Sequence, residues 1–317
     1  MGKKAKKVLW KNIFPAICMP LNNDYSVDEK SLRKYVRWMS GLEGIGGILV
    51  NGHASEVVTF SREERKRITA VVVDEVGQRI PVVSGINCEG TLEAVRHAKD
   101  AVEAGASAVM IQPVHSWLRS GVNKETAVTF IRDIAESVPE EEIAVQVYPK
   151  TCKATYNTEM IVEMAQIPNV KVMKLGIRDC AAYETAIREL RAQCPDVAVF
   201  TSYDEALVMS MFEPLDGALI GMGGCIPELV VEAWNAVQSG NWERIRTCRR
   251  RVDILSAAVY GMAECGGESH ARAKEVLFQR GGIPSALARR PVLPLSQKEK
   301  DAIAEAIREA GIAKIEL

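Results

Sequence analysis

The stretch N-V-K-V-M-K-L-G, residues 169–176, has the pattern of one short β-strand that ends at a lysine and a glycine. Side chains alternate between the two faces of a strand, so Val170, Val172 and Lys174 are expected to share one face. A lysine in line with two valines is unusual for a buried strand. The role of Lys174 is therefore the first question that the rest of the sequence has to answer.

Lys174 stands at the carboxyl end of its strand, where an α/β enzyme would hold a reactive amine. Burial beside apolar neighbours disfavours the ammonium form and lowers its pKa, which frees the amine to attack a carbonyl group. The alternative is a lysine that caps an edge strand and reaches water. The rest of the sequence favours the reactive lysine.

Short apolar runs alternate with segments of helical period along most of the chain. The expected strands are 13–19, 45–50, 80–84, 108–112, 143–148, 170–175, 197–201 and 217–220. The expected helices between and after them are 28–39, 61–76, 91–104, 124–137, 158–166, 180–193, 204–212 and one opened by Pro227. From residue 241 onward only helices are expected, over 242–262, 268–280 and 296–310.

Eight strand–helix units in about 230 residues predict parallel strands closed into a barrel rather than an open sheet. The predicted fold class is α/β, a (β/α)8 TIM barrel with a C-terminal helical appendage. We expect a flexible basic N-terminus at 1–12, a catalytic barrel at 13–240 and a helical region at 241–317. No G-x-G-x-x-G follows the first strand, which counts against dinucleotide binding.

Composition excludes several classes of partner. The chain has 317 residues, 47% of them hydrophobic, and a net charge of −1, so no global field suggests nucleic acid or a membrane surface. No apolar run approaches the ~18 residues of a membrane span. The eight cysteines form no C-x-x-C pair, which indicates reduced, cytoplasmic thiols rather than disulfides or a zinc site. We expect no metal ion.

The motifs at the carboxyl ends of the strands resemble those of the dihydrodipicolinate synthase / N-acetylneuraminate lyase family of Schiff-base aldolases. The resemblance covers residues 13–311 and is carried by 51–56, 85–87 with Thr91, 104–106, 112–113, 172–174, 215–221 and 290–295. Local similarity to the hydratase-aldolase branch of that family appears at 126–128, 138–139 and 174–177.

The resemblance implies that Lys174 condenses with pyruvate or another 2-oxo acid, with the covalent imine in place of any cofactor. It also implies that the loop after the second strand binds the carboxylate of that acid, through backbone N–H groups and a hydroxyl from Gly52, Ala54 and Ser55. Ser55 can equally be a plain turn residue. Ile220 and Gly221, at the end of the last strand, are further substrate-binding candidates. A homo-oligomer, tetramer or dimer, is implied as well.

Three positions depart from the family pattern. Gln146 stands where the family has a proton-relaying tyrosine, and a glutamine is neither acid nor base. Tyr148, two residues on, is expected on the same face and is a candidate for the relay. His53 and His115 fall on the other two relay positions, and histidine titrates near neutrality. The two remaining histidines lie on expected helices and are interpreted as structural: His97 and His270.

The second substrate is harder to predict. Dihydrodipicolinate synthases proper place an arginine after the strand-five proline, where this chain has Lys150, a point charge without the bidentate fork. We therefore expect a Schiff-base lyase of unspecified second substrate, acting by aldol cleavage, condensation or dehydration. One alternative is 4-hydroxy-tetrahydrodipicolinate synthase itself. Another is a non-catalytic barrel that binds an oxo acid or sugar acid, which Gln146 favours.

Overall fold

The structure is a computed structural model that describes residues 7–261 and 269–317. The expectations for residues 3–6, for the glycine-rich break at 265–267 and for Cys265 lie outside these ranges. The segment predicted to be flexible up to residue 12 is packed from Val8 onward, and Val8 and Trp10 are buried. In the two described ranges no helix is long and apolar enough to cross a membrane.

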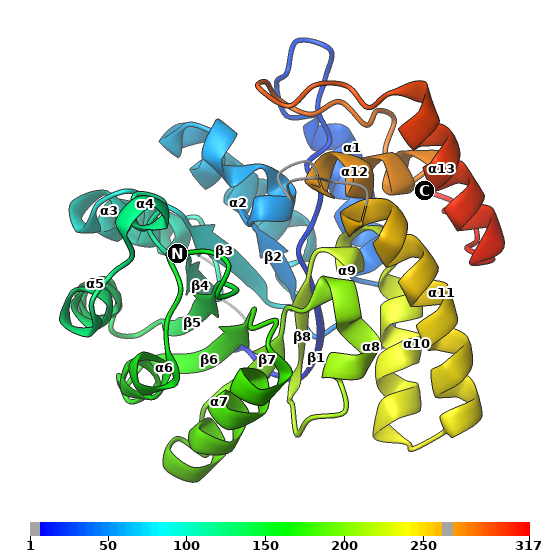
Figure 1. Ribbon diagram of the computed structural model, residues 1–317. Coiled ribbons are helices and arrows are strands. Elements are labelled where there is room, and N and C mark those ends of the chain that lie inside the picture. Colours follow the sequence, from blue (N-terminus) through cyan, green and yellow to red (C-terminus); the bar gives the residue numbers. More distant parts are fainter. Residues whose placement is uncertain (1–6, 262–268) are drawn as a thin grey trace.

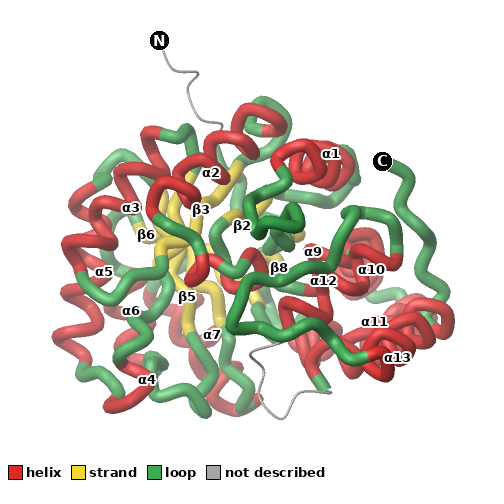
Figure 2. The backbone as a smooth tube through the Cα atoms, turned by 90° about the horizontal axis from the view of Figure 1, so that it is seen from above, coloured by secondary structure: helices red, strands yellow, loops and turns green. Residues whose placement is uncertain are grey.

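Eight parallel strands form the predicted barrel, with helices around it (Figures 1 and 2). The strands are β1 (Asn12–Pro15), β2 (Ile48–Val50), β3 (Val82–Ile86), β4 (Ala108–Ile111), β5 (Glu142–Val147), β6 (Val170–Leu175), β7 (Ala198–Thr201) and β8 (Gly217–Ile220). Their order is β1-β8-β7-β6-β5-β4-β3-β2, and isolated parallel bridges between the β1 and β2 segments close the ring. The first strand is shorter than predicted, because its pairing with β8 ends at Pro15.

The long helices follow the predicted sequence segments closely. They are α1 (Glu29–Met39), α2 (Arg62–Val76), α3 (Thr91–Glu103), α5 (Lys124–Ser137), α6 (Thr158–Ala165), α7 (Cys180–Gln193), α10 (Pro227–Gln238), α11 (Trp242–Tyr260), α12 (Ser269–Gln279) and α13 (Gln297–Glu309). A capping box of Ser61 and Glu64 begins α2 where the sequence predicted the start of a helix. These agreements reflect caps and apolar periods that are local in the sequence.

Shorter elements were predicted less well. The expected helix over 204–212 is a 3₁₀ turn, η3 (Asp204–Ala206), followed by a single α-helical turn, α8 (Leu207–Ser210). Two short helices, α4 (Trp117–Ser120) and α9 (Met222–Cys225), were expected to be loops. The loop after β2 contains two 3₁₀ turns, η1 (His53–Ser55) and η2 (Val57–Thr59).

The prediction that Val170 shares a face with Lys174 is wrong. Val172 lies in the barrel interior, whereas Val170 packs outward among the helices. The cause is an irregularity in the pairing of β5 and β6, where Ile143 pairs with Val170 but the next residue, Ala144, pairs with Val172. An extra residue of this kind shifts the alternation of side chains by one position.

Aromatic side chains fill the amino-terminal end of the barrel. The rings of Trp10 and Phe14 stack with centroids 5.2 Å apart, and Phe14 meets Phe200 edge-on at 5.3 Å. Trp10 also donates a hydrogen bond from Nε1 to the Glu142 carboxylate at 2.6 Å. With that end filled, functional groups are confined to the carboxyl ends of the strands.

A buried ion pair joins the C-terminal helices to the loop after β2. The Nζ of Lys274, on α12, lies 2.7 Å from Oε1 of Glu56, and both side chains are at most 1% exposed. The other Glu56 oxygen accepts the backbone N–H of Arg289 at 2.7 Å, and Lys274 also donates to the Leu287 carbonyl. Glu56 is held in the left-handed region at φ 60°. The pair therefore fixes the end of η1 against α12.

Replacing one partner of this pair should be costly. We expect Glu56→Gln to lower the free energy of unfolding by about 3–5 kcal/mol, because the Lys274 ammonium is left buried without a counter-charge. The loss should shrink as pH rises above neutrality, since the stranded ammonium can then release its proton. Urea denaturation at several pH values measures it.

The matched control is Glu305→Gln, which removes an exposed pair with Arg308 on α13. That change should cost less than about 1 kcal/mol. Equal losses in the two variants would contradict the role given to the buried pair.

Candidate active site

A cavity of about 510 Å³ opens at the carboxyl ends of the strands. Its walls come from the loop after β2, from the ends of β5 to β8, from α11 and α12, and from the segment around Pro291. A site in this position is typical of barrel enzymes. Lys174, Gln146, His53 and His115, all predicted from the sequence, line it.

Lys174 is the buried amine of this cavity, with 7% of its surface exposed. Burial lowers the pKa of its ammonium group to about 8; the Asp204 carboxylate acts in the opposite direction, and the Arg178 guanidinium lowers it further. In the described part of the chain no hydrogen bond or ion pair reaches the amine. At pH 7 roughly a tenth of Lys174 is therefore neutral, as a nucleophile must be, against about one part in three thousand for an ordinary lysine.

Gln146 is the direct neighbour of Lys174 on the adjoining strand, because β5 and β6 pair these two residues. Its side chain is 8% exposed, and its Oε1 atom has no hydrogen-bond partner in the described part of the chain. An unsatisfied buried amide oxygen is costly unless a ligand supplies a donor. Gln146 thus presents an open acceptor beside the amine.

His53, Tyr148 and His115 are brought together at one side of the cavity. Nε2 of His53 is hydrogen-bonded to the Tyr148 hydroxyl, and the His53 and His115 rings stack at 18° with centroids 5.7 Å apart. Tyr148 follows the last residue of β5, so strand alternation no longer sets its direction. The structure places it behind His53 instead of on the cavity wall with Gln146.

The charge state of this cluster follows from its surroundings. Desolvation by the surrounding protein lowers the pKa of His53, and the charge of Lys174 lowers it further. The ring is still accessible from the cavity. Burial raises the pKa of Tyr148 well above its usual value. At neutral pH both groups are uncharged, and the tautomer of the His53 ring decides which of them donates the hydrogen bond.

The loop after β2 reaches the cavity through His53 and Ala54. The Ser55 hydroxyl donates to the Ile17 carbonyl at 2.6 Å and is fully buried, so its proton is not available to a substrate. Gly52 is buried beneath the turn, and its carbonyl accepts the Ser55 N–H. Of the expected anion site, the N–H groups of residues 53 and 54 remain as donors.

Asp204 is a site residue that the sequence reasoning missed. Its carboxylate is 7% exposed and accepts the N–H groups of Met222 at 2.8 Å and Gly221 at 3.3 Å. The donors expected to bind a substrate anion after β8 are therefore already used by the protein's own carboxylate. Gly221 lines the cavity, whereas Ile220 is buried beneath it.

The cation at the cavity is Arg178, whereas Lys150 is exposed and does not line it. Arg178 donates from Nη1 to the Gly176 and Ser202 carbonyls at 2.9 and 3.0 Å, and Nη2 pairs with Glu205 at 2.7 Å. It thereby ties the ends of β6 and β7 together. Nothing in the sequence predicted Arg178 as a cation of the cavity, apart from its position four residues after Lys174.

The C-terminal helices also supply cavity residues. His270, on α12, was interpreted as structural from the sequence but lines the cavity, whereas His97 is buried on α3 against Glu93. Tyr260, the last residue of α11, lines the cavity as well. Neither helix is near Lys174 in sequence, so no local pattern could have placed them there.

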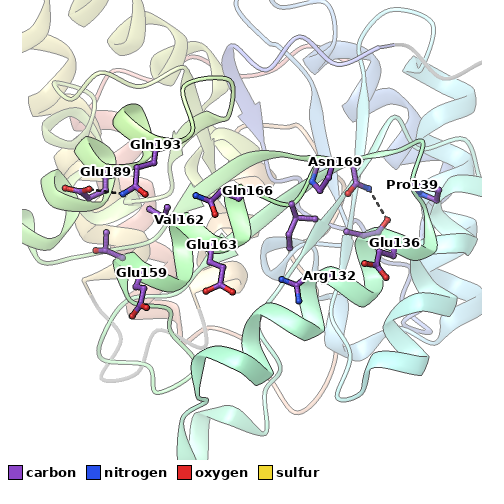
Figure 3. A pocket seen from close by; sticks show the side chains of 14 residues that line it. Arg132, Glu136, Pro139, Glu159, Val162, Glu163, Gln166, Asn169, Glu189 and Gln193 are labelled. Carbon is purple, nitrogen blue, oxygen red and sulfur yellow. Dashed lines mark hydrogen bonds between the residues drawn. The ribbon is translucent and has the colours of Figure 1, made fainter.

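A larger cavity of about 860 Å³ lies on the outside of the barrel between α5, α6 and α7 (Figure 3). It holds none of the predicted site residues, and Asn169, on its wall, precedes the amino end of β6. It is open to solvent and rimmed by carboxylates from α5 to α7. In the described residues no group of three or more His, Cys, Asp or Glu side chains could hold a metal ion.

A closed (β/α)8 barrel with a buried, weakly basic lysine at the carboxyl end of β6 defines a lyase of the class I aldolase type. The family model of the dihydrodipicolinate synthetase family matches residues 9–310. The chain belongs to this family, as the order of its motifs predicted.

Curated relatives match over nearly their whole length. The 4-hydroxy-tetrahydrodipicolinate synthase of Bartonella quintana is 27% identical over 96% of this chain and 99% of its own. The protein of the same name from Methanothrix thermoacetophila is 26% identical over 92% and 94%.

Solved structures show the same fold. A prophage protein of the dihydrodipicolinic acid synthase family from E. coli K12, solved in complex with pyruvate, has a TM-score of 0.87 and 19% identity over 96% of this chain and 100% of its own. A monomeric dihydrodipicolinate synthase variant has a TM-score of 0.86 and 21% identity over 95% and 97%.

Because Lys174 is buried and forms no ion pair with any described residue, it should destabilise the protein. We expect Lys174→Met to raise the free energy of unfolding at pH 7 by about 2–3 kcal/mol. The folded pKa of about 8 lies below the ordinary 10.5, so the gain should be largest below pH 8 and vanish as pH rises toward 10.5. Denaturant melts across this range measure it.

Lys171→Met is the control, because Lys171 lies on the same strand and is only half-buried. It should produce no comparable pH-dependent gain. A Lys174→Met protein no more stable than the parent below pH 8 would contradict the lowered pKa.

Proposed function

We propose that this protein is a Schiff-base lyase in which Lys174 condenses with pyruvate or another 2-oxo acid. The observation that carries the proposal is the buried, partly neutral amine at the centre of a cavity large enough for a small acid. The names of the curated relatives and the pyruvate complex of the E. coli K12 neighbour support it. The imine takes the place of a cofactor.

The chemistry requires a neutral amine first and a protonated imine afterwards. The amine attacks the 2-oxo carbon, water leaves, and the resulting iminium draws electrons from the adjacent carbon. Loss of a proton from that carbon gives an enamine, which can form or break a carbon–carbon bond. The negative charge of Asp204 near Lys174 favours the cationic imine. The same charge raises the pKa of the free amine, against the effect of burial.

His53 is the proposed proton carrier on the cavity wall, with Tyr148 behind it. The hydroxyl of Tyr148 fixes the ring through Nε2, and His115 stacks on the other side. In the tautomer that donates its Nε2–H to the Tyr148 oxygen, Nδ1 of the neutral His53 ring carries the lone pair that accepts a proton from the substrate and returns it. In this arrangement the loop histidine performs the work that Gln146 cannot, and Gln146 accepts a hydrogen bond from the bound substrate.

The second substrate is left open by the geometry. Lys150 points to solvent, so it does not hold the carboxylate of an aldehyde substrate as the arginine of the synthases proper would. This disfavours 4-hydroxy-tetrahydrodipicolinate synthase, despite the names of the relatives. A homo-oligomer stays a prediction, and one solved neighbour is described as a monomeric variant.

Borohydride reduction in the presence of pyruvate tests the imine. We expect a stable pyruvate adduct on Lys174, located by intact-mass and peptide analysis, and none in Lys174→Arg. Lys171→Arg, on the same strand, should retain the adduct. Absence of any adduct with pyruvate and with longer 2-oxo acids would refute the lyase and leave a barrel that only binds its ligand.

Exchange of the pyruvate methyl protons with D₂O, followed by NMR, tests the proton carrier. We expect His53→Gln to slow this exchange by about 10²–10⁴-fold, the usual contribution of a positioned general base. Tyr148→Phe should slow it less, because it only removes the hydrogen bond that orients the ring.

Tyr156→Phe is the control, since Tyr156 is buried outside the cavity and its hydroxyl has no partner in the described part of the chain. Undiminished exchange in His53→Gln would assign the proton transfer to another group.

A further inference from the structure

Tyr260 reaches the cavity from a helix outside the barrel. It is the last residue of α11, and its side chain projects over the end of β8. A Cβ atom added to Gly221 would lie 2.6 Å from the Tyr260 hydroxyl and 3.8 Å from both carboxylate oxygens of Asp204. Only glycine at position 221 leaves room for the hydroxyl in this place, since 2.6 Å is closer than real Cβ contacts.

Tyr260 and His53 approach Lys174 from different directions around the ring. Going from β6 through β5 and β4 toward β2 leads to Gln146, His115 and His53. Going the other way, through β7 to β8, leads to Asp204 and Gly221, over which Tyr260 lies. In this order β2 lies across the ring from β6, and β8 lies between them, so a substrate bound to Lys174 has proton-carrying groups at two different positions.

The Tyr260 hydroxyl is available to a ligand. In the described part of the chain it has no hydrogen-bond partner, although it faces the cavity and a phenol normally finds one. Burial raises the pKa of Tyr260 well above its usual value, and the Asp204 charge adds to the shift. The group consequently keeps its proton at neutral pH and acts as a donor.

We infer that Tyr260 is a catalytic residue that donates its proton to the oxygen on the carbon joined to, or cleaved from, the 2-oxo acid. The inference rests on the proposed function and assigns its substrates to 4-hydroxy-2-oxo acids. Because Tyr260 lies on the β8 side of the cavity and His53 on the β2 side, Tyr260 can bind the oxygen of such an acid while His53 serves the carbon next to the imine.

The step balances without any further reactant. In condensation, the enamine carbon forms a bond to the aldehyde carbon, and the nitrogen lone pair forms the iminium double bond. The carbonyl π pair moves to the aldehyde oxygen, which takes the Tyr260 proton, and the phenolate regains a proton from water. Cleavage runs through the same transfers in reverse.

Two variants test this assignment. Tyr260→Phe removes the donor, and Gly221→Ala displaces it, since Gly221 has an ordinary φ of −70° that alanine tolerates. Each is compared with the parent and with Tyr156→Phe in three assays. These are borohydride trapping with pyruvate, D₂O exchange of its methyl protons, and trapping and cleavage of 4-hydroxy-2-oxo acids.

In both variants we expect pyruvate trapping and proton exchange to fall much less than the handling of 4-hydroxy-2-oxo acids. The concentration of a 4-hydroxy-2-oxo acid for half-maximal trapping should rise about tenfold, and any cleavage should slow about 10²-fold. Tyr156→Phe should match the parent throughout.

The inference is overturned if Tyr260→Phe handles the 4-hydroxy acids as the parent does, or if all assays decline equally, which would indicate a structural role. The trapping of 4-hydroxy acids needs no turnover, so it decides the matter even where cleavage is undetectable. Failure of the parent to trap any 2-oxo acid would instead remove the proposed function itself.

Discussion

The buried ion pair between Glu56 and Lys274 holds the two halves of the site together. It clamps the loop that carries His53 to α12, which carries His270. Without a fixed α12, the cavity would lose one of its walls. The C-terminal helices are thus part of the cavity's construction and not a detached appendage, since residues 274 and 289 donate the hydrogen bonds that the buried Glu56 carboxylate accepts.

Two buried lysines in this chain have opposite tasks, which their surroundings decide. Lys274 is fully buried and donates hydrogen bonds to the Glu56 carboxylate and the Leu287 carbonyl. These two acceptors stabilise its ammonium form against the cost of burial. Burial lowers the pKa of both amines, but Lys174, which is almost as buried, has no hydrogen-bond acceptor in the described part of the chain. The protein tolerates a destabilised amine where chemistry needs one, and the barrel around it supplies the stability.

The barrel and the position of Lys174 could be predicted from the sequence because both depend on local patterns. Alternation along a strand, helix caps and the position of Lys174 at a strand end are readable within about ten residues. Val170 was misplaced because a strand irregularity depends on the partner strand. Asp204 and Tyr260 were missed because a cavity wall is assembled from segments that meet only in three dimensions. Ser55 was found, but the use of its hydroxyl depends on Ile17.

The structure also gives the glutamine at position 146 a different interpretation from a lost proton relay. A strand position is fixed by register, so residue 146 must face Lys174 whatever its side chain. The ends of loops and helices are under no such constraint and can approach the same cavity from several directions. His53 does so from the loop after β2, across the ring from Lys174, and Tyr260 does so over the end of β8. Loss of a tyrosine from β5 therefore removes one route for protons without emptying the cavity of groups that carry them, and the amide left behind is free to bind.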